Sequence, residues 1–109
     1  LAVLVVHTMG AERYWICDVA GQERHERDRD AEFRTRGVEL PALLQLIDST
    51  EQSVHRTLEK MTLADLDQPR LSWRHNDYDT AAWALNHALE HTALHLGHMH
   101  ITRQWWDQR

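Results

Sequence analysis

The sequence contains a single cysteine, only two prolines and four glycines, and no long hydrophobic run. Because Cys17 has no partner in the chain, an internal disulfide is excluded. A lone thiol is typical of a reducing compartment, so we expect a cytoplasmic protein. The apolar opening LAVLVV is too short for the core of a signal peptide or for a membrane span, and no membrane partner is expected.

The chain is also poor in lysine and carries an excess of acid. It has 12 Lys and Arg residues against 17 Asp and Glu residues, which gives a net charge of -5 with histidine neutral. Proteins whose main partner is a nucleic acid need clustered basic residues that neutralise phosphates. We therefore expect no nucleic-acid partner.

The length of 109 residues fits one domain, residues 1–109, with a small core. Apolar residues recur at helical spacing in three stretches, which predict helices over residues 1–20, 40–61 and about 80–105. Pro41 suits the first turn of the middle helix. The sequence TLAD at residues 62–65 resembles an N-terminal capping box, and Asp79 or Thr80 is expected to cap the last helix.

The connections between these helices are long and polar. Residues 22–36 carry ten charges of mixed sign and predict a solvated loop or a short exposed helix, with Phe33 able to contact the core. Residues 71–79 are interpreted as a polar connection, since nothing in the chain alternates long enough to force a strand. The fold class is thus all-α, either a small three-helix bundle or about three helices of a four-helix bundle. The chain begins with Leu inside an apolar run, so we expect a further helix to precede it.

Five of the nine histidines lie in the stretch HALEHTALHLGHMH, residues 87–100. At about 100° per residue, four of them share one face of the predicted helix: His87, His91, His95 and His98. His100 lies nearly opposite. Two histidines four residues apart can hold one metal ion from a single helix, and a third ligand should then come from another element.

His7 is the best candidate for that third ligand, because it lies on the apolar face of the first helix. The other histidines are less suitable, since His25 and His75 lie in connections and His55 lies near the core stripe of the middle helix. A polar stripe of satisfied core histidines is the alternative to a metal site. Four histidines on one face plus His7 favour the metal, because clustered imidazoles would otherwise leave many polar atoms to satisfy.

Four segments together resemble the DinB/YfiT-like superfamily of small bacterial metalloproteins: VLVVHTMGAERYWICDV, RDRDAEF, TLADLDQP and WALNHALEHTALHLGHM. The resemblance covers almost the whole chain. It implies a four-helix bundle with a long crossover connection, whose first helix has no counterpart here. It also implies a divalent metal held by His7 from the family's second helix and by His91 and His95 from its fourth. The family usually has Arg and Gln beside a glycine there, whereas this chain reads Leu96-Gly97-His98.

Relatives of this kind are transferases or isomerases that use low-molecular-weight thiols such as mycothiol and bacillithiol. The resemblance therefore implies a small-molecule thiol and an electrophilic substrate as partners, and a divalent ion as cofactor, with Zn or Ni favoured and Fe as an alternative. His87 and His98 are candidates for supporting the ligands. A metal-binding stress-response module without catalysis, or a structural domain with a vestigial site, remain as alternatives. No further catalytic residue is assigned, and a homodimer is possible because the apolar faces are only partly covered.

Overall fold

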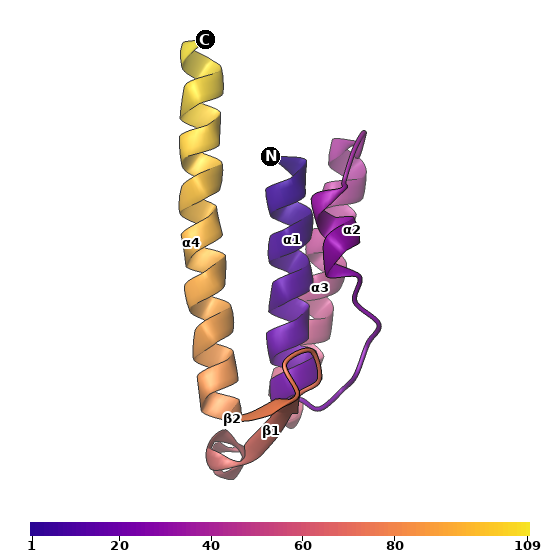
Figure 1. The fold of residues 1–109 in the computed structure, drawn as a ribbon, viewed down its shortest axis with the longest axis vertical. Helices are drawn as coiled ribbons and strands as arrows, with labels where there is room; N and C mark the ends of the chain where they lie inside the picture. The colour runs from indigo at the N-terminus through magenta and orange to yellow at the C-terminus, as the bar shows by residue number, and fades with distance from the viewer.

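The computed structural model describes all residues from 1 to 109, and the predicted all-α fold class is confirmed. Along the chain the elements are α1 (Ala2–Arg13), η1 (Tyr14–Ala20), α2 (Arg29–Phe33), α3 (Leu40–Lys60), η2 (Leu63–Asp67), β1 (Pro69–Ser72), β2 (Asp77–Thr80) and α4 (Ala81–Gln108). Three long helices run side by side, and the short elements lie at one end and along one side of them (Figure 1).

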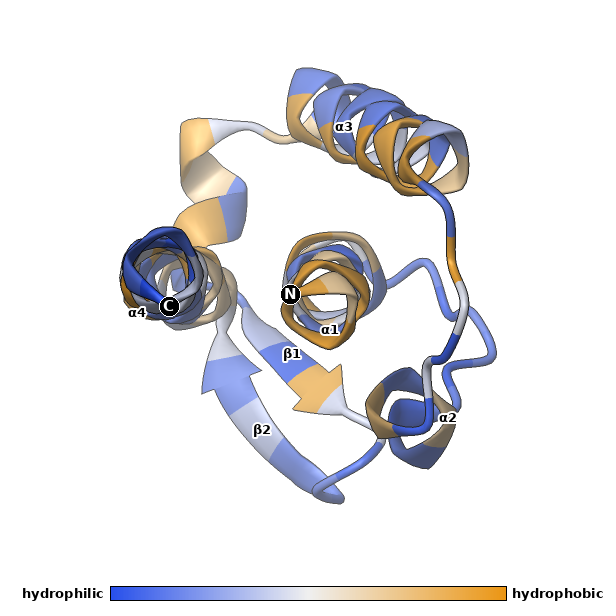
Figure 2. Cartoon of the chain, turned by 90° about the horizontal axis from the view of Figure 1, so that it is seen from above, coloured by the Kyte–Doolittle hydropathy of each residue, from blue (hydrophilic) through white to orange (hydrophobic).

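The first predicted helix is continuous in space but changes its winding. Beyond Arg13 the regular α-helix passes into the wider π-helical turns of η1, and the run ends at Gly21 as expected. The amide of Gly21 donates to the carbonyl of Ile16 at 2.8 Å, five residues back. Seen along the bundle, α1 lies at the centre of the molecule, surrounded by α3, α4, α2 and the hairpin (Figure 2). Every residue of η1 is buried, so this segment is the centre of the core.

The other two long helices begin where the sequence predicts. Pro41 stands in the first turn of α3, where its missing N–H has no helical partner to lose. The hydroxyl of Thr80 accepts a hydrogen bond from the amide of Trp83 at 3.1 Å and caps α4. Thr62 and Asp65 form the predicted capping box at the start of η2. These three local signals are independent of tertiary packing, which explains why sequence alone locates them.

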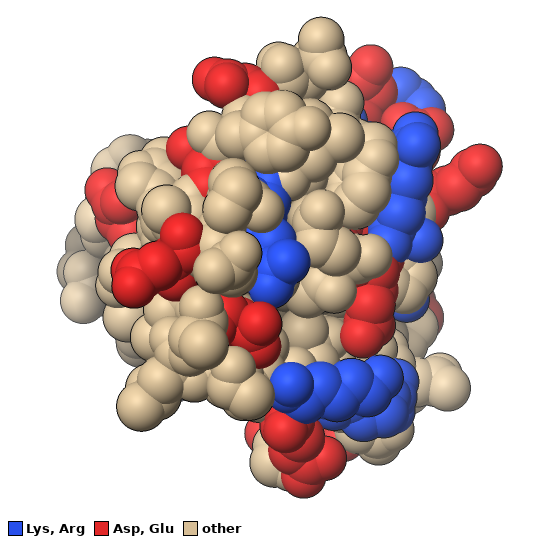
Figure 3. All heavy atoms as spheres, turned by 90° about the horizontal axis from the view of Figure 1, so that it is seen from below, with Lys and Arg blue, Asp and Glu red and all other residues tan.

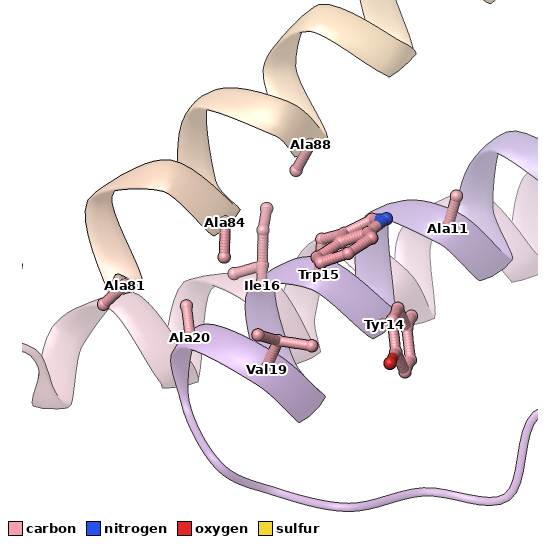
Figure 4. Close-up of a cluster of buried hydrophobic side chains, with 9 residues drawn as sticks. All are labelled: Ala11, Tyr14, Trp15, Ile16, Val19, Ala20, Ala81, Ala84 and Ala88. Atoms are coloured by element: carbon pink, nitrogen blue, oxygen red, sulfur yellow. The ribbon is translucent and has the colours of Figure 1, made fainter. Parts of the chain in front are cut away.

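The core is small and rich in alanine (Figure 4). Its buried members are Ala11, Tyr14, Trp15, Ile16, Val19, Ala20, Ala81, Ala84 and Ala88. Ala81, Ala84 and Ala88 recur on one face of α4, and their small side chains let this helix approach η1 closely. This close approach fixes the position of the histidine-bearing part of α4 relative to α1.

Much of the apolar stripe of α3 remains exposed. Val54 and Met61 pack against the core, whereas Leu40, Leu44 and Leu58 are between 43% and 64% exposed. The C-terminal half of α4 similarly exposes a group of large apolar side chains: Leu94, Leu96, Ile101, Trp105 and Trp106. The amphipathic pattern therefore predicts the helices correctly but overstates how much of their apolar surface this chain covers.

Two expectations about the connections need correction. The stretch interpreted as a polar connection forms an antiparallel hairpin, with Leu71 paired to Tyr78 and Ser72 to Asp77. Strands of four residues are too short to show alternation, and Asn76 in the turn adopts the left-handed conformation that asparagine tolerates. The charged segment does contain the expected loop and short helix, but it is not solvated throughout. Glu32 within it is buried.

No helix of the structure is both long enough and apolar enough to cross a membrane.

We predict opposite effects on stability for alanine at two glycines. A Cβ at position 21 would lie 2.5 Å from Cγ2 of Thr57 and 2.8 Å from the backbone oxygen of Cys17, so Gly21→Ala should lower the free energy of unfolding by about 1–3 kcal/mol. At Gly97 a Cβ meets nothing within 4 Å, so Gly97→Ala should stabilise α4 by about 1 kcal/mol. Denaturant titration measures both. Equal effects of the two substitutions would contradict the packing described at Gly21.

Candidate metal centre

Three imidazoles converge between α1 and α4. His7 comes from α1, and His91 and His95 come from consecutive turns of α4. The Nε2 atom of His91 lies 3.2 Å from Nε2 of His7 and 3.2 Å from Nε2 of His95. One ring nitrogen from each residue lies within 4.8 Å of the other two. The structure thus brings together the three residues singled out in the sequence, and they could hold a metal ion.

His7 is held in place by a carboxylate that the sequence analysis did not identify. Its Nδ1–H donates to Oε1 of Glu32 at 3.1 Å. Arg27 donates two hydrogen bonds of 2.8 Å to the same carboxylate, from Nε to Oε2 and from Nη2 to Oε1. Carboxylates commonly orient metal-ligating histidines in this way. The connection between η1 and α3, residues 21–39, therefore supplies the carboxylate that orients a candidate ligand on α1.

Gly10 makes room for this carboxylate. A Cβ at position 10 would lie 2.0 Å from Oε2 of Glu32, so any larger residue would displace the glutamate. The sequence shows this glycine only as a weakness in the first helix. The structure shows why it is needed, because Glu32 lies directly over the backbone one turn beyond His7.

The hydrogen bond to Glu32 determines which atom of His7 faces the cluster. A neutral imidazole has one N–H, and placing it on Nδ1 leaves a lone pair on Nε2. His91 can donate from Nε2 to one neighbour at most, although two nitrogens lie 3.2 Å from it. Its Nδ1 is buried without any partner. The imidazole nitrogens of the cluster thus carry more lone pairs than there are N–H groups to donate to them. A bound cation would accept these lone pairs.

The spacing also fits a metal ion. Two nitrogens bound at 2.0–2.1 Å to one tetrahedral Zn²⁺ lie about 3.3 Å apart. The two separations measured here, 3.2 Å each, are close to that value. The remaining pair, from His7 and His95, lies within 4.8 Å. The donor set and two of its three separations therefore agree with a divalent ion that accepts imidazole.

Two of the imidazoles are held in the neutral form that a metal needs. Burial, together with the neighbouring His95 and His7, lowers the pKa of His91 to about 4. Burial, with His7 and His98 nearby, also lowers the pKa of His95. At neutral pH both rings therefore keep a free lone pair, which is the form that binds divalent ions.

The remaining histidines of α4 occupy three different environments. Nδ1 of His98 lies 3.1 Å from Nδ1 of His95, on the side of that ring away from the cluster. His87 stacks on Trp83 at 4.7 Å and meets the edge of Trp15 at 4.7 Å, so it stays outside the cluster. His100 is exposed on α4.

The histidines outside α4 and α1 are bound to other groups. His25 donates from Nδ1 to Oδ1 of the buried Asp18 at 2.7 Å. Nδ1 of His75 lies 2.7 Å from the hydroxyl of Ser72. His55 is exposed and pairs with Glu59 on its own helix. The expectation that it lies near the core stripe of that helix was wrong. None of these three belongs to the cluster.

A pocket of about 340 Å³ opens beside the cluster. Its walls are His7, Ala11, Tyr14, Trp15, Arg27, Arg29, Arg74, His75, His87 and His91. Two of the three clustered histidines thus face a space large enough for a small molecule.

At the end of the molecule that carries the hairpin, acidic and basic side chains are mixed with larger uncharged areas of the surface (Figure 3).

Cys17 plays no part in this pocket. Its side chain is fully buried in the core, and burial raises the pKa of its thiol. A protonated, inaccessible thiol is a packing group and not a nucleophile.

We predict that the cluster makes stability depend on pH. Because the pKa of His91 falls from 6.5 in the unfolded chain to about 4 in the folded one, the unfolded chain binds more protons between these values. The metal-free protein should therefore lose stability as the pH falls from 6.5 to about 4. The melting temperature of His91→Gln should fall less over this window than that of the control His100→Gln. Parallel curves for the two variants would show that His91 is not the group responsible.

Comparison with known proteins supplies one match. The family model described as Mycothiol-S-transferase matches residues 1–108. No curated protein and no solved structure matches the chain. A match over nearly the whole chain bears out the resemblance to DinB-like proteins seen in the sequence. The chain belongs to the mycothiol-S-transferase family.

Proposed function

We propose that the protein is a metal-dependent transferase that joins a low-molecular-weight thiol, of the mycothiol or bacillithiol type, to small electrophiles. The observation that carries this proposal is the convergence of three Nε2 atoms, from His7, His91 and His95, beside an open pocket. Membership of the mycothiol-S-transferase family supports the thiol. The single cysteine fits a cytoplasmic location, where such a thiol would be reduced.

The three histidines would be the protein ligands of a divalent ion, with Zn or Ni favoured and Fe as an alternative. Imidazole suits all of these ions. Three neutral ligands leave the charge of the ion uncompensated and leave room for a further ligand, which is the arrangement of catalytic and not of structural sites. When bound, such an ion lowers the pKa of a coordinated thiol, and so supplies the nucleophilic thiolate.

The residues of the chain would prepare the site for this chemistry. Glu32 holds the proton of His7 on Nδ1, so that Nε2 stays free to bind. His98 is in reach of Nδ1 of His95 and would orient that ring in the same manner. His87, held between Trp15 and Trp83, forms part of the pocket wall where the substrates would meet.

The first test is metal content. We expect about one Zn or Ni ion per chain in the purified protein, measured by elemental analysis. His91→Ala should abolish binding, because it removes the nitrogen that contacts both other ligands. His100→Ala is the matched control, since it removes an exposed histidine from the same helix. Equal metal content in the two variants would refute the ligand assignment.

The second test is thiol transfer. With mycothiol and monochlorobimane, the sulfur should displace chloride from the electrophile to form a fluorescent thioether, while the thiol proton passes to the buffer. We expect the metal-loaded protein to accelerate this reaction, and His91→Ala to lose the acceleration while His100→Ala keeps it. A fully metal-loaded protein that does not accelerate conjugation would favour the alternative, a metal-binding module without catalysis.

We also propose that the chain forms a homodimer through its uncovered apolar faces. Leu44 and Leu58 on α3, and Trp105 on α4, are 56%, 43% and 74% exposed. Apolar surfaces of this kind usually mark an interface. Sedimentation velocity should show a dimer for the unchanged protein. The substitution Leu44→Gln should shift the equilibrium toward the monomer. A monodisperse monomer at all concentrations would contradict this proposal.

A further inference from the structure

The charged side chains that line the pocket beside the histidine cluster are all basic, whereas the whole chain has a negative net charge. Arg27, Arg29 and Arg74 all line it, and no aspartate or glutamate does. The chain as a whole has five more acidic than basic residues. Three arginines in one pocket of an acidic protein therefore need a physical explanation.

Arg27 is already explained by its partner. Its guanidinium makes two hydrogen bonds to Glu32, and its side chain is only 12% exposed. The positive charge of Arg27 is therefore balanced by the carboxylate that holds His7. It is not available for a ligand.

Arg29 has no such partner. Arg29 takes part in none of the ion pairs of the structure, and the neighbouring Asp28 pairs with Arg34 instead. Its guanidinium lies 4.9 Å from the centre of the Phe33 ring. That ring in turn packs on the ring of His7, with the centroids 4.6 Å apart. Arg29 is thus held close to the cluster by aromatic contacts while its hydrogen-bond donors stay free.

Arg74 approaches the same pocket from the turn of the hairpin. Its amide donates to the hydroxyl of Tyr14 at 3.1 Å, and that hydroxyl lies 2.7 Å from Oγ of Ser72. These bonds fix the backbone of the turn against the buried η1 segment. The guanidinium of Arg74 forms no ion pair, so a second arginine without a partner lines the pocket, from a different element.

We propose that Arg29 and Arg74 bind a carboxylate group of the electrophilic substrate. A guanidinium presents parallel N–H donors that match the two oxygens of a carboxylate. The electrophile must lie beside the sulfur that attacks it, and the pocket adjoins two of the histidines that would hold the thiol-binding ion, His7 and His91. The assignment to the electrophile rests on the proposed transferase function, whereas the presence of a carboxylate site does not.

The test uses the metal-free full chain, because a bound ion would itself attract carboxylates. Succinate is titrated by calorimetry, and succinamide serves as the uncharged probe of the same shape. We expect succinate to bind with a Kd of about 1 mM, as suits exposed charges, and succinamide not to bind measurably. Circular dichroism checks that the metal-free protein and each variant are folded.

Substitution then identifies the residues. Arg29→Gln and Arg74→Gln should each weaken succinate binding, and the double variant should weaken it about tenfold or more. Arg56→Gln is the matched control, since it removes the same charge from α3, where Arg56 contacts only Ser53. Equal succinate binding in the double variant and in the control would overturn the proposal, as would equal binding of succinamide.

A competition experiment separates the two possible sources of the carboxylate. Of the two thiol types, bacillithiol carries carboxylates, on its malyl group, whereas mycothiol carries none. If the site belongs to the electrophile, the Kd for succinate should be unchanged in the presence of bacillithiol. Displacement of succinate by bacillithiol would overturn the assignment to the electrophile and give the site to the thiol. Metal content, measured separately, decides the proposed metal function independently of either result.

Discussion

The buried carboxylate of Glu32 is the interaction on which the rest of the site depends. It accepts a hydrogen bond from Nδ1–H of His7 and two more from Arg27. This arrangement places the lone pair of His7 on Nε2, 3.2 Å from Nε2 of His91 on α4. Gly10 must stay small for the carboxylate to reach this position. The connection between η1 and α3 therefore determines which nitrogen of His7 on α1 faces the histidines of α4.

The same cluster is unfavourable without a cation. Neutral imidazoles face one another with too few protons between them, and Nδ1 of His91 is buried without a partner. Burying such groups costs free energy that the small, alanine-rich core must offset. A site that is costly when empty and satisfied when filled is typical of a binding centre. The low pKa of His91 has the same origin, since burial opposes its protonated form.

Features with local signals were predictable from the sequence, and features that depend on distant partners were not. The helix bounds followed from periodicity, from Pro41 and from the caps at Thr62 and Thr80. The shared face of the α4 histidines followed from helical geometry. Glu32 was missed because charged side chains surround it in a segment of mixed charge, and no spacing rule links it to a histidine twenty-five residues away. The hairpin was missed because four-residue strands show no period.

The central claim is that Glu32 prepares His7 to bind a metal together with the α4 histidines. The most direct test is the affinity for Zn²⁺, measured by competition with a chelator, in the variant Glu32→Gln. Glu39→Gln is the control, because the side chain of Glu39 makes no capping hydrogen bond at the start of α3. The loss of the carboxylate charge should weaken binding by about 10–100-fold in Glu32→Gln and leave the control unchanged. An unchanged affinity in Glu32→Gln would contradict the account.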